Sequence, residues 1–455
     1  MRGAPRRAAA PRSAAERWTL VISDLVPGGD GLGRLPDGRI AFVRGGLPGD
    51  SVEIEVEADK GSHVFARVIS LVTPSPDRVE APCPIVDQCG GCPLMKLSAE
   101  AQARAKESML RQSLTRLARL SEAELRLVRP LHSVGGALGY RNRLRMQHRS
   151  GHLGFFREKS HDWVRVHDCK IASSELNDLL RATRERLSGA PSFLEAVELR
   201  VLADRDTPGG ARAVSLLVKE DSREAEKALA QTVGPLEGLG VVRVVPLRGR
   251  ARPAHPETFQ KLWVEPETYV LLAPFAFNQV NLAVNERLIE LVLERARAAN
   301  AETFFDLYGG AGNFTLPLLR RGLSGTLVEV QAESVEAARR AAEAQGLRGG
   351  EFVPGDVPIV AKQLLSSGRS ADVVILDPPR KGALPALQAA LGLAKKAILL
   401  VSCDPPTFAR DLRFLLDRGA RLLDVTPLDM FPQTHHLEVL ACLDVSSSGG
   451  GTIEE

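Results

Sequence analysis

Two apolar runs near the end of the chain constrain its fold more than any other feature. The runs ADVVIL (371–376) and AKKAILLVS (394–402) are strand-like, and a double proline follows each of them within three residues. Such strands are typical of a parallel sheet with helices on both sides. Because ligands bind at the carboxyl edge of such a sheet, we expect Asp377 and Cys403 at a site rather than in the core.

From about Leu271 onward, strand-like and helix-like segments alternate regularly. Strand-like pieces such as TFFDLYGG and GTLVEV are separated by helical patterns such as SVEAARRAAEAQ. This alternation predicts a Rossmann-like, doubly wound α/β domain. The last two runs, RLLDVTPLDMFP and HHLEVLACLDV, are joined by too short a link for a crossover helix. An antiparallel hairpin is therefore expected to close the sheet.

The first half of the chain has other patterns. Over 18–72, short alternating runs are separated by Gly, Pro and Asp turns, which predicts a small β-barrel in which Gly31 and Gly33 are turn residues. An amphipathic helix over 97–120, later strand-like runs and a helix over 173–187 predict a mixed α+β domain. The expected divisions are a disordered basic tail (1–16), the barrel (17–73), a central domain (74–265), the α/β domain (266–446) and a disordered tail (447–455).

Charge and cysteine content exclude some classes of protein. The net charge of +3 is too small to indicate nucleic-acid binding by itself, and no apolar run approaches the roughly 18 residues of a membrane-spanning helix. The basic start lacks the apolar core of a secretion signal, although a transit peptide is an alternative to a disordered tail. Six cysteines in such a chain favour reduced thiols, metal ligation or catalysis over disulfides. We expect a cytoplasmic monomer without membrane contact.

The segment DLYGGAGNFTLPLL indicates a ligand site at the start of a helix. Its glycines let a ligand approach the backbone, and Glu329, about 16 residues beyond Asn313, ends the next strand, where it can accept hydrogen bonds from ribose hydroxyls. A NAD site is the competing interpretation, although G-x-G-x-x-G is absent. Asp356 ends the third strand, either as a contact for an adenine amine or as a turn residue.

Cys403 is a candidate nucleophile because a thiolate adds to electron-poor carbon. The alternative is a cysteine that only faces a loop. Glu438 begins the last, antiparallel strand, so it is expected at the same edge of the sheet as Cys403. A thiol and a carboxylate in one pocket suit a reaction that adds a nucleophile and later removes a proton.

A third group of residues has metal-ligand spacing. Four thiolates suit zinc or an iron–sulfur cluster, and unliganded thiols are the alternative. The candidate ligands are Cys83, Cys89, Cys92 and Cys169. The segment before the last of them is basic and aromatic, and it includes Arg141, Arg143, Arg145 and Phe155. Basic side chains contact phosphates and aromatic rings stack on unpaired bases, so RNA binding competes here with a solvated basic face.

Taken together, the motifs FNQVN, DLYGGAGNFTLPL, DPPRKG, SCDPPTFARDL and FPQTHHLE make the chain resemble the RNA uracil-5-methyltransferases that use S-adenosylmethionine. The resemblance covers nearly all of 18–445. It is greatest to the branch with an N-terminal, OB-like TRAM barrel and a 4Fe-4S cluster, which includes 23S rRNA methylases. It implies that Cys403 is the nucleophile, that Glu438 accepts the proton and that Phe277 stacks on the target base. The implied cofactor contacts are Gln279, Tyr308, Asn313, Glu329, Asp356 and Asp377, and the four cysteines are the implied cluster ligands.

The resemblance implies methylation of carbon 5 of a uridine, with 23S rRNA as the first candidate substrate and tRNA as the alternative. A non-catalytic RNA-binding assembly factor is the alternative of another class, and the presence of Cys403 and Glu438 argues against it. Three residues depart from the family pattern: Gly309 stands where Cys is frequent, Asp404 where Asn is usual and Gln433 where His is common. An ionised Asp404 close to Cys403 is expected to disfavour the thiolate.

Overall fold

The computed structural model describes residues 16–157, 160–190, 193–202, 211–219, 227, 229, 231, 239–246, 259–273 and 276–446. The expected disordered tails lie outside the described residues, apart from residue 16. The chain divides into two compact units, one formed by 1–80 with 93–109 and the other by 81–92 with 110–455. Within the described ranges, no helix is long and apolar enough to cross a membrane.

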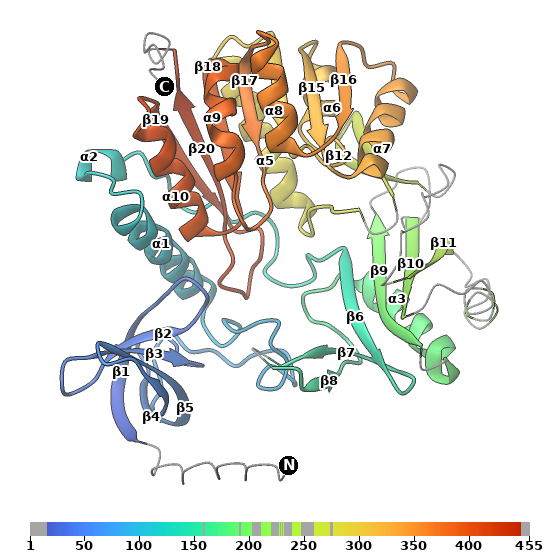
Figure 1. Cartoon of the computed structure of the whole chain (residues 1–455). Coiled ribbons are helices and arrows are strands. Elements are labelled where there is room, and N and C mark those ends of the chain that lie inside the picture. The colour runs from blue at the N-terminus through green and yellow to red at the C-terminus, as the bar shows by residue number, and fades with distance from the viewer. Residues whose placement is uncertain are drawn as a thin grey trace, which may run out of the picture. The chain divides into compact units, whose positions relative to one another are not determined.

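The first unit contains the predicted barrel (Figure 1). Its strands close in the order β1-β2-β3-β5-β4 around a fully buried interior that includes Ile22 and Val52. They are β1 (Arg17–Leu25), β2 (Gly31–Arg34), β3 (Ile40–Arg44), β4 (Ser51–Asp59) and β5 (His63–Thr73). Gly31 and Gly33 are not turn residues as expected. They lie in β2, where a Cβ on Gly33 would stand 2.6 Å from Leu20 Cδ1.

The longer part of the second unit begins with the last residues of α1 (Ala99–Arg116) and the short helix α2 (Glu122–Leu125). The predicted mixed α+β domain follows them. A six-stranded sheet has the order β11-β10-β9-β6-β7-β8, and Leu176 and Leu180 of α3 pack into the same apolar core as this sheet. The elements are β6 (Arg143–Arg149), β7 (His152–Phe156), β8 (Trp163–Arg165), α3 (Ser174–Arg186), a 3-10 turn (Leu187–Gly189), β9 (Leu194–Leu202), β10 (Ala211–Val218) and β11 (Leu239–Pro246). The basic segment of the sequence therefore folds as strands, in which buried Leu144 and Met146 alternate with Arg143 and Arg145.

The α/β domain has the predicted seven-stranded sheet, in the order β16-β15-β14-β17-β18-β20-β19. β14 to β18 are parallel, and β20 pairs antiparallel with both β18 and β19, so the closing hairpin is confirmed. The strands are β14 (Thr303–Leu307), β15 (Ser324–Glu329), β16 (Gly350–Pro354), β17 (Ala371–Leu376), β18 (Ala394–Ser402), β19 (Arg421–Leu428) and β20 (Glu438–Asp444).

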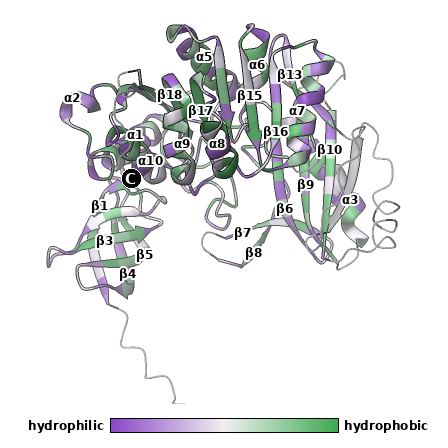
Figure 2. Cartoon of the chain, turned by 45° about the horizontal axis from the view of Figure 1, so that its top comes forward, coloured by the Kyte–Doolittle hydropathy of each residue, from purple (hydrophilic) through white to green (hydrophobic). Residues whose placement is uncertain are grey.

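Helices cover both faces of this sheet, and the two faces form separate apolar cores. All six residues of β17 are buried, as expected for a central parallel strand. Figure 2 shows hydrophobic colouring on these strands and mixed colouring on helices such as α5 and α7. The helices are α5 (Leu282–Ala298), α6 (Thr315–Arg320), α7 (Ala332–Ala344), α8 (Val357–Ser366), α9 (Leu384–Leu393) and α10 (Pro405–Leu416). A hairpin of β12 (Gln260–Glu265) and β13 (Thr268–Leu272) precedes them.

Candidate active site

The carboxyl edge of the seven-stranded sheet collects side chains that follow its parallel strands. Glu329 ends β15, Tyr308 follows β14, Asp377 follows β17 and Cys403 follows β18. These four strands are neighbours in that order. The folding pattern thus places four residues that are far apart in sequence along one edge, as the strand pattern predicts.

Glu438 joins this edge from the opposite direction. β20 runs antiparallel to β18, and the pairing of Ser402 with Val439 places Cys403 opposite Glu438. Directly opposed residues of an antiparallel pair project from the same face of the sheet. The thiol and the carboxyl group therefore meet at one place.

Burial controls the charge of these acids. Burial raises the pKa of Asp377 to about 7, and the nearby carboxyl of Asp306 adds to the effect. Glu438 is only 2 % exposed, and burial raises its pKa well above the usual range, with a further contribution from Asp377. Burial thus shifts both carboxyl groups toward their protonated forms.

Cys403 is a half-buried thiol beside an acid. Burial and, next, the charge of Glu438 together raise the pKa of Cys403 to about 12, and Arg380 acts in the opposite direction. Asp404, which the sequence identified as a possible obstacle to the thiolate, has a smaller effect than Glu438 or Asp377. Its side chain caps α10 by accepting a hydrogen bond from Thr407 N–H at 3.0 Å.

A cleft opens beside the glycine-rich turn. Its lining includes four of the predicted cofactor contacts, Gln279, Tyr308, Asn313 and Asp377, together with exposed Phe277. The remaining lining residues are Leu262, Val270, Leu272, Asn278, Gly309, Gly310 and Ala311. The FNQVN motif and the turn after β14 thus form walls of the same cleft.

The turn itself has a backbone that few side chains tolerate. Tyr308 and Gly310 have φ of 68° and 54°, and Gly310 N–H donates a hydrogen bond to Glu329 Oε2 at 3.3 Å. A Cβ on Gly309 would stand 2.8 Å from Leu327 Cγ and 2.9 Å from Asp306 Oδ2. Glycine at position 309, where cysteine is frequent in the family, therefore fits the close packing of this turn.

Asp356 and Asn313 have hydrogen-bond partners that the sequence pattern does not reveal. Asp356 caps α8 by accepting a hydrogen bond from Ile359 N–H at 3.2 Å, and it is near enough to raise the pKa of Tyr308. Asn313 exchanges two hydrogen bonds of 2.9 Å with Asn285 of α5. Asn285 has no signal in the sequence, because a polar residue on a helix is ordinary until its partner is known.

The four candidate metal ligands lie close enough to influence one another's charge. Burial raises the pKa of Cys92 to about 12, and Cys169, Cys89 and Cys83 add to the effect. Among the described residues, however, no three His, Cys, Asp or Glu side chains are grouped to hold a single metal ion.

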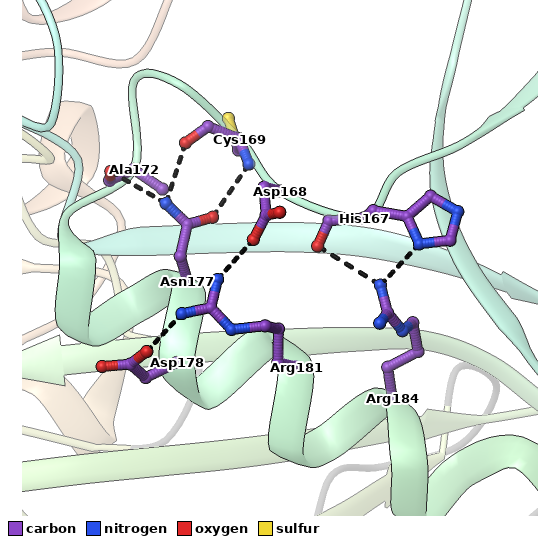
Figure 3. Close-up of polar contacts among 8 residues, drawn as sticks. All are labelled: His167, Asp168, Cys169, Ala172, Asn177, Asp178, Arg181 and Arg184. Atoms are coloured by element: carbon purple, nitrogen blue, oxygen red, sulfur yellow. Dashed lines mark hydrogen bonds and ion pairs between the residues drawn. The ribbon is translucent and has the colours of Figure 1, made fainter.

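A network on α3 holds the loop of the fourth cysteine (Figure 3). Asn177 accepts from Cys169 N–H at 2.8 Å and donates to the carbonyl oxygens of Cys169 and Ala172. Arg181 donates to both Asp168 and Asp178. The backbone around Cys169 is thereby fixed to the helix.

The predicted RNA-contacting residues lie in the central sheet and the FNQVN segment. Phe277 is 62 % exposed, and the Arg143 guanidinium lies 5.5 Å from the centre of its ring. Arg145 is exposed and Arg141 is half-buried. Phe155 packs partly against the core of the central sheet, so less of its ring is available than the sequence pattern implies.

Comparison with known proteins identifies the family. The family model of the TRAM domain matches residues 16–69, and that of the tRNA (Uracil-5-)-methyltransferases matches residues 260–349. The chain is 34% identical over 442 residues to the 23S rRNA (uracil(1939)-C(5))-methyltransferase RlmD of Methylococcus capsulatus, covering 94% of this chain and 97% of that protein. The chain belongs to the RNA uracil-5-methyltransferase family. It is thus an S-adenosylmethionine-dependent enzyme that methylates uracil in RNA.

Other relatives agree with this family. An uncharacterized RNA methyltransferase of Gloeobacter violaceus is 33% identical, covering 94% of this chain and 96% of that protein. The crystal structure of the Pyrococcus abyssi tRNA (uracil-54, C5)-methyltransferase with S-adenosyl-L-homocysteine has a TM-score of 0.69 and 24% identity, and the match covers 94% of this chain and 100% of that one. The RNA uracil-5-methyltransferase fold is therefore shared along most of the chain.

Proposed function

We propose that this enzyme methylates carbon 5 of a uridine in 23S rRNA, with Cys403 as nucleophile and Glu438 as proton acceptor. The observation that carries the proposal is the register of β18 and β20, in which the last pair is Ser402 with Val439, so that Cys403 and Glu438 are the next two residues to face each other. Asp377, which lines the cofactor cleft, affects the pKa of both side chains. Several relatives at 30 to 34% identity are named as 23S rRNA enzymes, which favours rRNA over tRNA.

The residue types fit the chemistry of an unreactive carbon. Addition of the Cys403 thiolate to carbon 6 of uracil moves electrons to carbon 5, which becomes nucleophilic. S-adenosylmethionine supplies the methyl group as an electrophile. Glu438, as carboxylate, then takes the proton from carbon 5, and the electrons of that C–H bond expel Cys403 and restore the 5,6 double bond. Both side chains must lose a proton first, because burial favours their neutral forms.

The cofactor contacts follow from the walls of the cleft. Glu329 can accept hydrogen bonds from ribose hydroxyls, since it ends the strand next to the glycine-rich turn. Gln279, Tyr308, Asn313 and Asp377 complete the contacts. Asp356 has a weaker role in this arrangement because its carboxylate already caps α8.

The four cysteines are proposed to hold a 4Fe-4S cluster. Burial, with the neighbouring thiols, raises the pKa of Cys89, Cys92 and Cys169, so these side chains lie near one another. Among the described residues they are not grouped around the position of a single ion, and a cluster is larger than one ion. Thiolates that raise one another's pKa by repulsion would be stabilised by a cationic metal centre. The cluster would fix the loop of Cys169, which Asn177 of α3 holds, to the loop of Cys83, Cys89 and Cys92.

The surface beside the cleft suits an extruded base. Phe277 is exposed at the mouth of the cofactor cleft, and Arg143 lies against its ring. A base that leaves its helix loses stacking worth a few kcal/mol, which an aromatic ring offsets in part. We propose that Phe277 stacks on the target uracil and that Arg141, Arg143 and Arg145 contact the backbone.

The catalytic assignment is tested with Glu438→Gln. This variant should add Cys403 to the RNA and transfer the methyl group without releasing product, so a covalent protein–RNA adduct should survive denaturing electrophoresis. Cys403→Ala should form no adduct and no product while binding S-adenosylmethionine as the wild type does. Cys442→Ala, which removes a buried thiol from the middle of β20, is the matched control and should remain active. Normal turnover by Glu438→Gln would assign the proton to another group.

The substrate is tested by mapping 5-methyluridine in total RNA from a deletion strain. Loss of one modified uridine in 23S rRNA, restored by the wild-type gene but not by Cys403→Ala, is the expected result. Loss of 5-methyluridine from tRNA alone would change the assigned substrate to tRNA and leave the assignment of the catalytic residues unchanged.

A further inference from the structure

A second cleft in the same compact unit is separate from the cofactor cleft. It has a volume of about 440 Å³. Its lining includes a glycine-rich loop with Gly135, Gly136 and Gly139, the start of α3 with Ser173 and Glu175, and the start of α5 with Asn281, Leu282 and Ala283. Leu138, Tyr140, Arg141, Asn142 and the end of β9, Val201 and Leu202, complete it. The proposed catalytic and cofactor residues do not line it.

Arg141 and Asn142 join the two helix starts through their backbones. Arg141 N–H donates to Ile171 O at 2.8 Å, and Ser173 N–H donates to Arg141 O at 3.0 Å, just before α3 begins. On the other side, Asn142 N–H donates to Val280 O at 3.1 Å, just before α5 begins. The geometry of the cleft is therefore fixed by backbone hydrogen bonds from one short segment to the starts of two helices that are distant in sequence.

Asn281 has an unused donor in this cleft. Its side-chain oxygen caps α5 by accepting a hydrogen bond from Val284 N–H at 3.4 Å. The donor of the side chain is its amide nitrogen, Nδ2. The residue is 98 % buried, at 2 % exposure, and Nδ2 has no hydrogen-bond partner. Arg141 Nε is also buried without a partner. A buried, unsatisfied donor is costly, so two of them at one cleft indicate an acceptor that is supplied from outside.

The charge of the cleft favours an anion. Leu282 and Ala283 belong to the first turn of the 17-residue helix α5, and N–H groups of a first turn have no partner within the helix. The helix dipole and the Arg141 guanidinium add positive potential. Glu175 also lines the cleft, and a hydrogen bond from its own backbone N–H lowers its pKa. That carboxylate occupies the start of α3, so the donors without a partner are Asn281 Nδ2 and Arg141 Nε.

We infer that this cleft binds one phosphodiester group of the RNA substrate. The inference rests on the proposed function for the identity of the anion, because RNA offers a phosphate at every nucleotide. Asn281 is the last residue of the FNQVN motif, which also carries Phe277 and Gln279. A phosphate held at the end of this motif would fix the backbone near a base that stacks on Phe277.

The test uses Asn281→Asp in the full-length protein. Aspartate caps helices as well as asparagine does, so α5 should be retained while the donor is lost and a negative charge is placed in the cleft. RNA affinity should fall about tenfold, and the salt dependence of log K should lose about 0.7 of its slope, which corresponds to one phosphate contact with a single strand. The KM for RNA should rise, with S-adenosylmethionine affinity and the kcat at saturating RNA unchanged.

Asn300→Asp is the matched control, because it introduces the same charge just beyond the other end of α5 at an exposed position. It should bind RNA as the wild type does. A scan of a substrate oligoribonucleotide with methylphosphonate linkages identifies the phosphate: one linkage should weaken wild-type binding about tenfold and leave Asn281→Asp binding unaffected.

Each outcome is decisive for one claim. If the wild type methylates the oligonucleotide and Asn281→Asp binds it as Asn300→Asp does, the phosphodiester site is refuted and the proposed function stands. If inorganic phosphate binds in an Asn281-dependent way while no linkage responds in the scan, the cleft holds a free anion and the RNA assignment is wrong. A wild-type protein that methylates no RNA would instead refute the proposed function.

Discussion

Asp306→Asn should make the stability of the enzyme less dependent on pH. Asp306 lies at the end of β14, fully buried beneath the glycine-rich turn. Burial raises the pKa of Asp306 from 3.8 to about 6, although Thr315 Oγ1–H donates to its Oδ2 at 2.6 Å. Its Oδ1 is buried without a partner, which is consistent with a carboxyl group that keeps its proton.

The sign of the effect follows from linkage. Because the folded state holds the proton more tightly than the unfolded state, stability is fully present below pH 3.8 and falls as the pH rises toward about 6. The gap between the two pKa values corresponds to about 3 kcal/mol at neutral pH. Asparagine has nearly the same shape without an ionisable group, so the variant should not show this loss.

The assay is urea denaturation followed by circular dichroism, for both proteins at several pH values between about 4 and 8. The free energy of unfolding of Asp306→Asn relative to wild type should increase by about 2 to 3 kcal/mol across this range, because a small part of the loss has already occurred at pH 4. Thr315→Val provides a second check, because loss of the hydroxyl donor should raise the pKa of Asp306 and extend the wild-type loss to higher pH. A difference between Asp306→Asn and wild type that is constant with pH would refute the reasoning.

Three other variants test separate parts of the site. Gly309→Cys should cost about 1 to 3 kcal/mol in urea denaturation, because its Cβ would crowd Leu327 and Asp306; unchanged stability would show that the turn relaxes freely. Arg380→Gln should raise the pKa of Cys403 and slow its alkylation at a given pH, measured by mass spectrometry of the Cys403 peptide, whereas a faster reaction would contradict the role of Arg380. Cys89→Ala, purified without oxygen, should lose iron and visible absorbance and bind RNA much more weakly than S-adenosylmethionine; stoichiometric zinc in the wild type would contradict the cluster.

The α/β fold was predictable because its strands are read from a strong local signal. The runs that became β17 and β18 are apolar on both faces, which only a central parallel strand requires, and their alternation with helices leaves few topologies. The hairpin of β12 and β13 had no such signal. Its strands alternate buried and half-buried residues, a pattern that short surface segments share.

The edge of the sheet was predictable for Cys403 and Glu438 for a related reason. Because β18 is parallel to β17 and β20 is antiparallel to β18, the end of β18 and the start of β20 must meet. Sequence could not reveal the pair of Asn313 and Asn285, since their contact depends on how α5 packs against the turn after β14. The same holds for Asp306, whose burial is a property of the packed turn.

The roles of the acidic residues that follow strands were ambiguous in the sequence. The residue that follows a parallel strand is often also the residue that begins the next helix, so one position serves both a ligand and a helix cap. Asp356 and Asp404 each accept a hydrogen bond from an N–H three residues ahead, as caps do. Asp377 is followed by two prolines and a turn before α9 begins at Leu384, so it caps no helix and lines the cofactor cleft. The distance from strand end to helix start therefore separates the two roles. It explains why Asp404 can replace asparagine beside the nucleophile: both residues cap α10, and the carboxylate is directed to the helix.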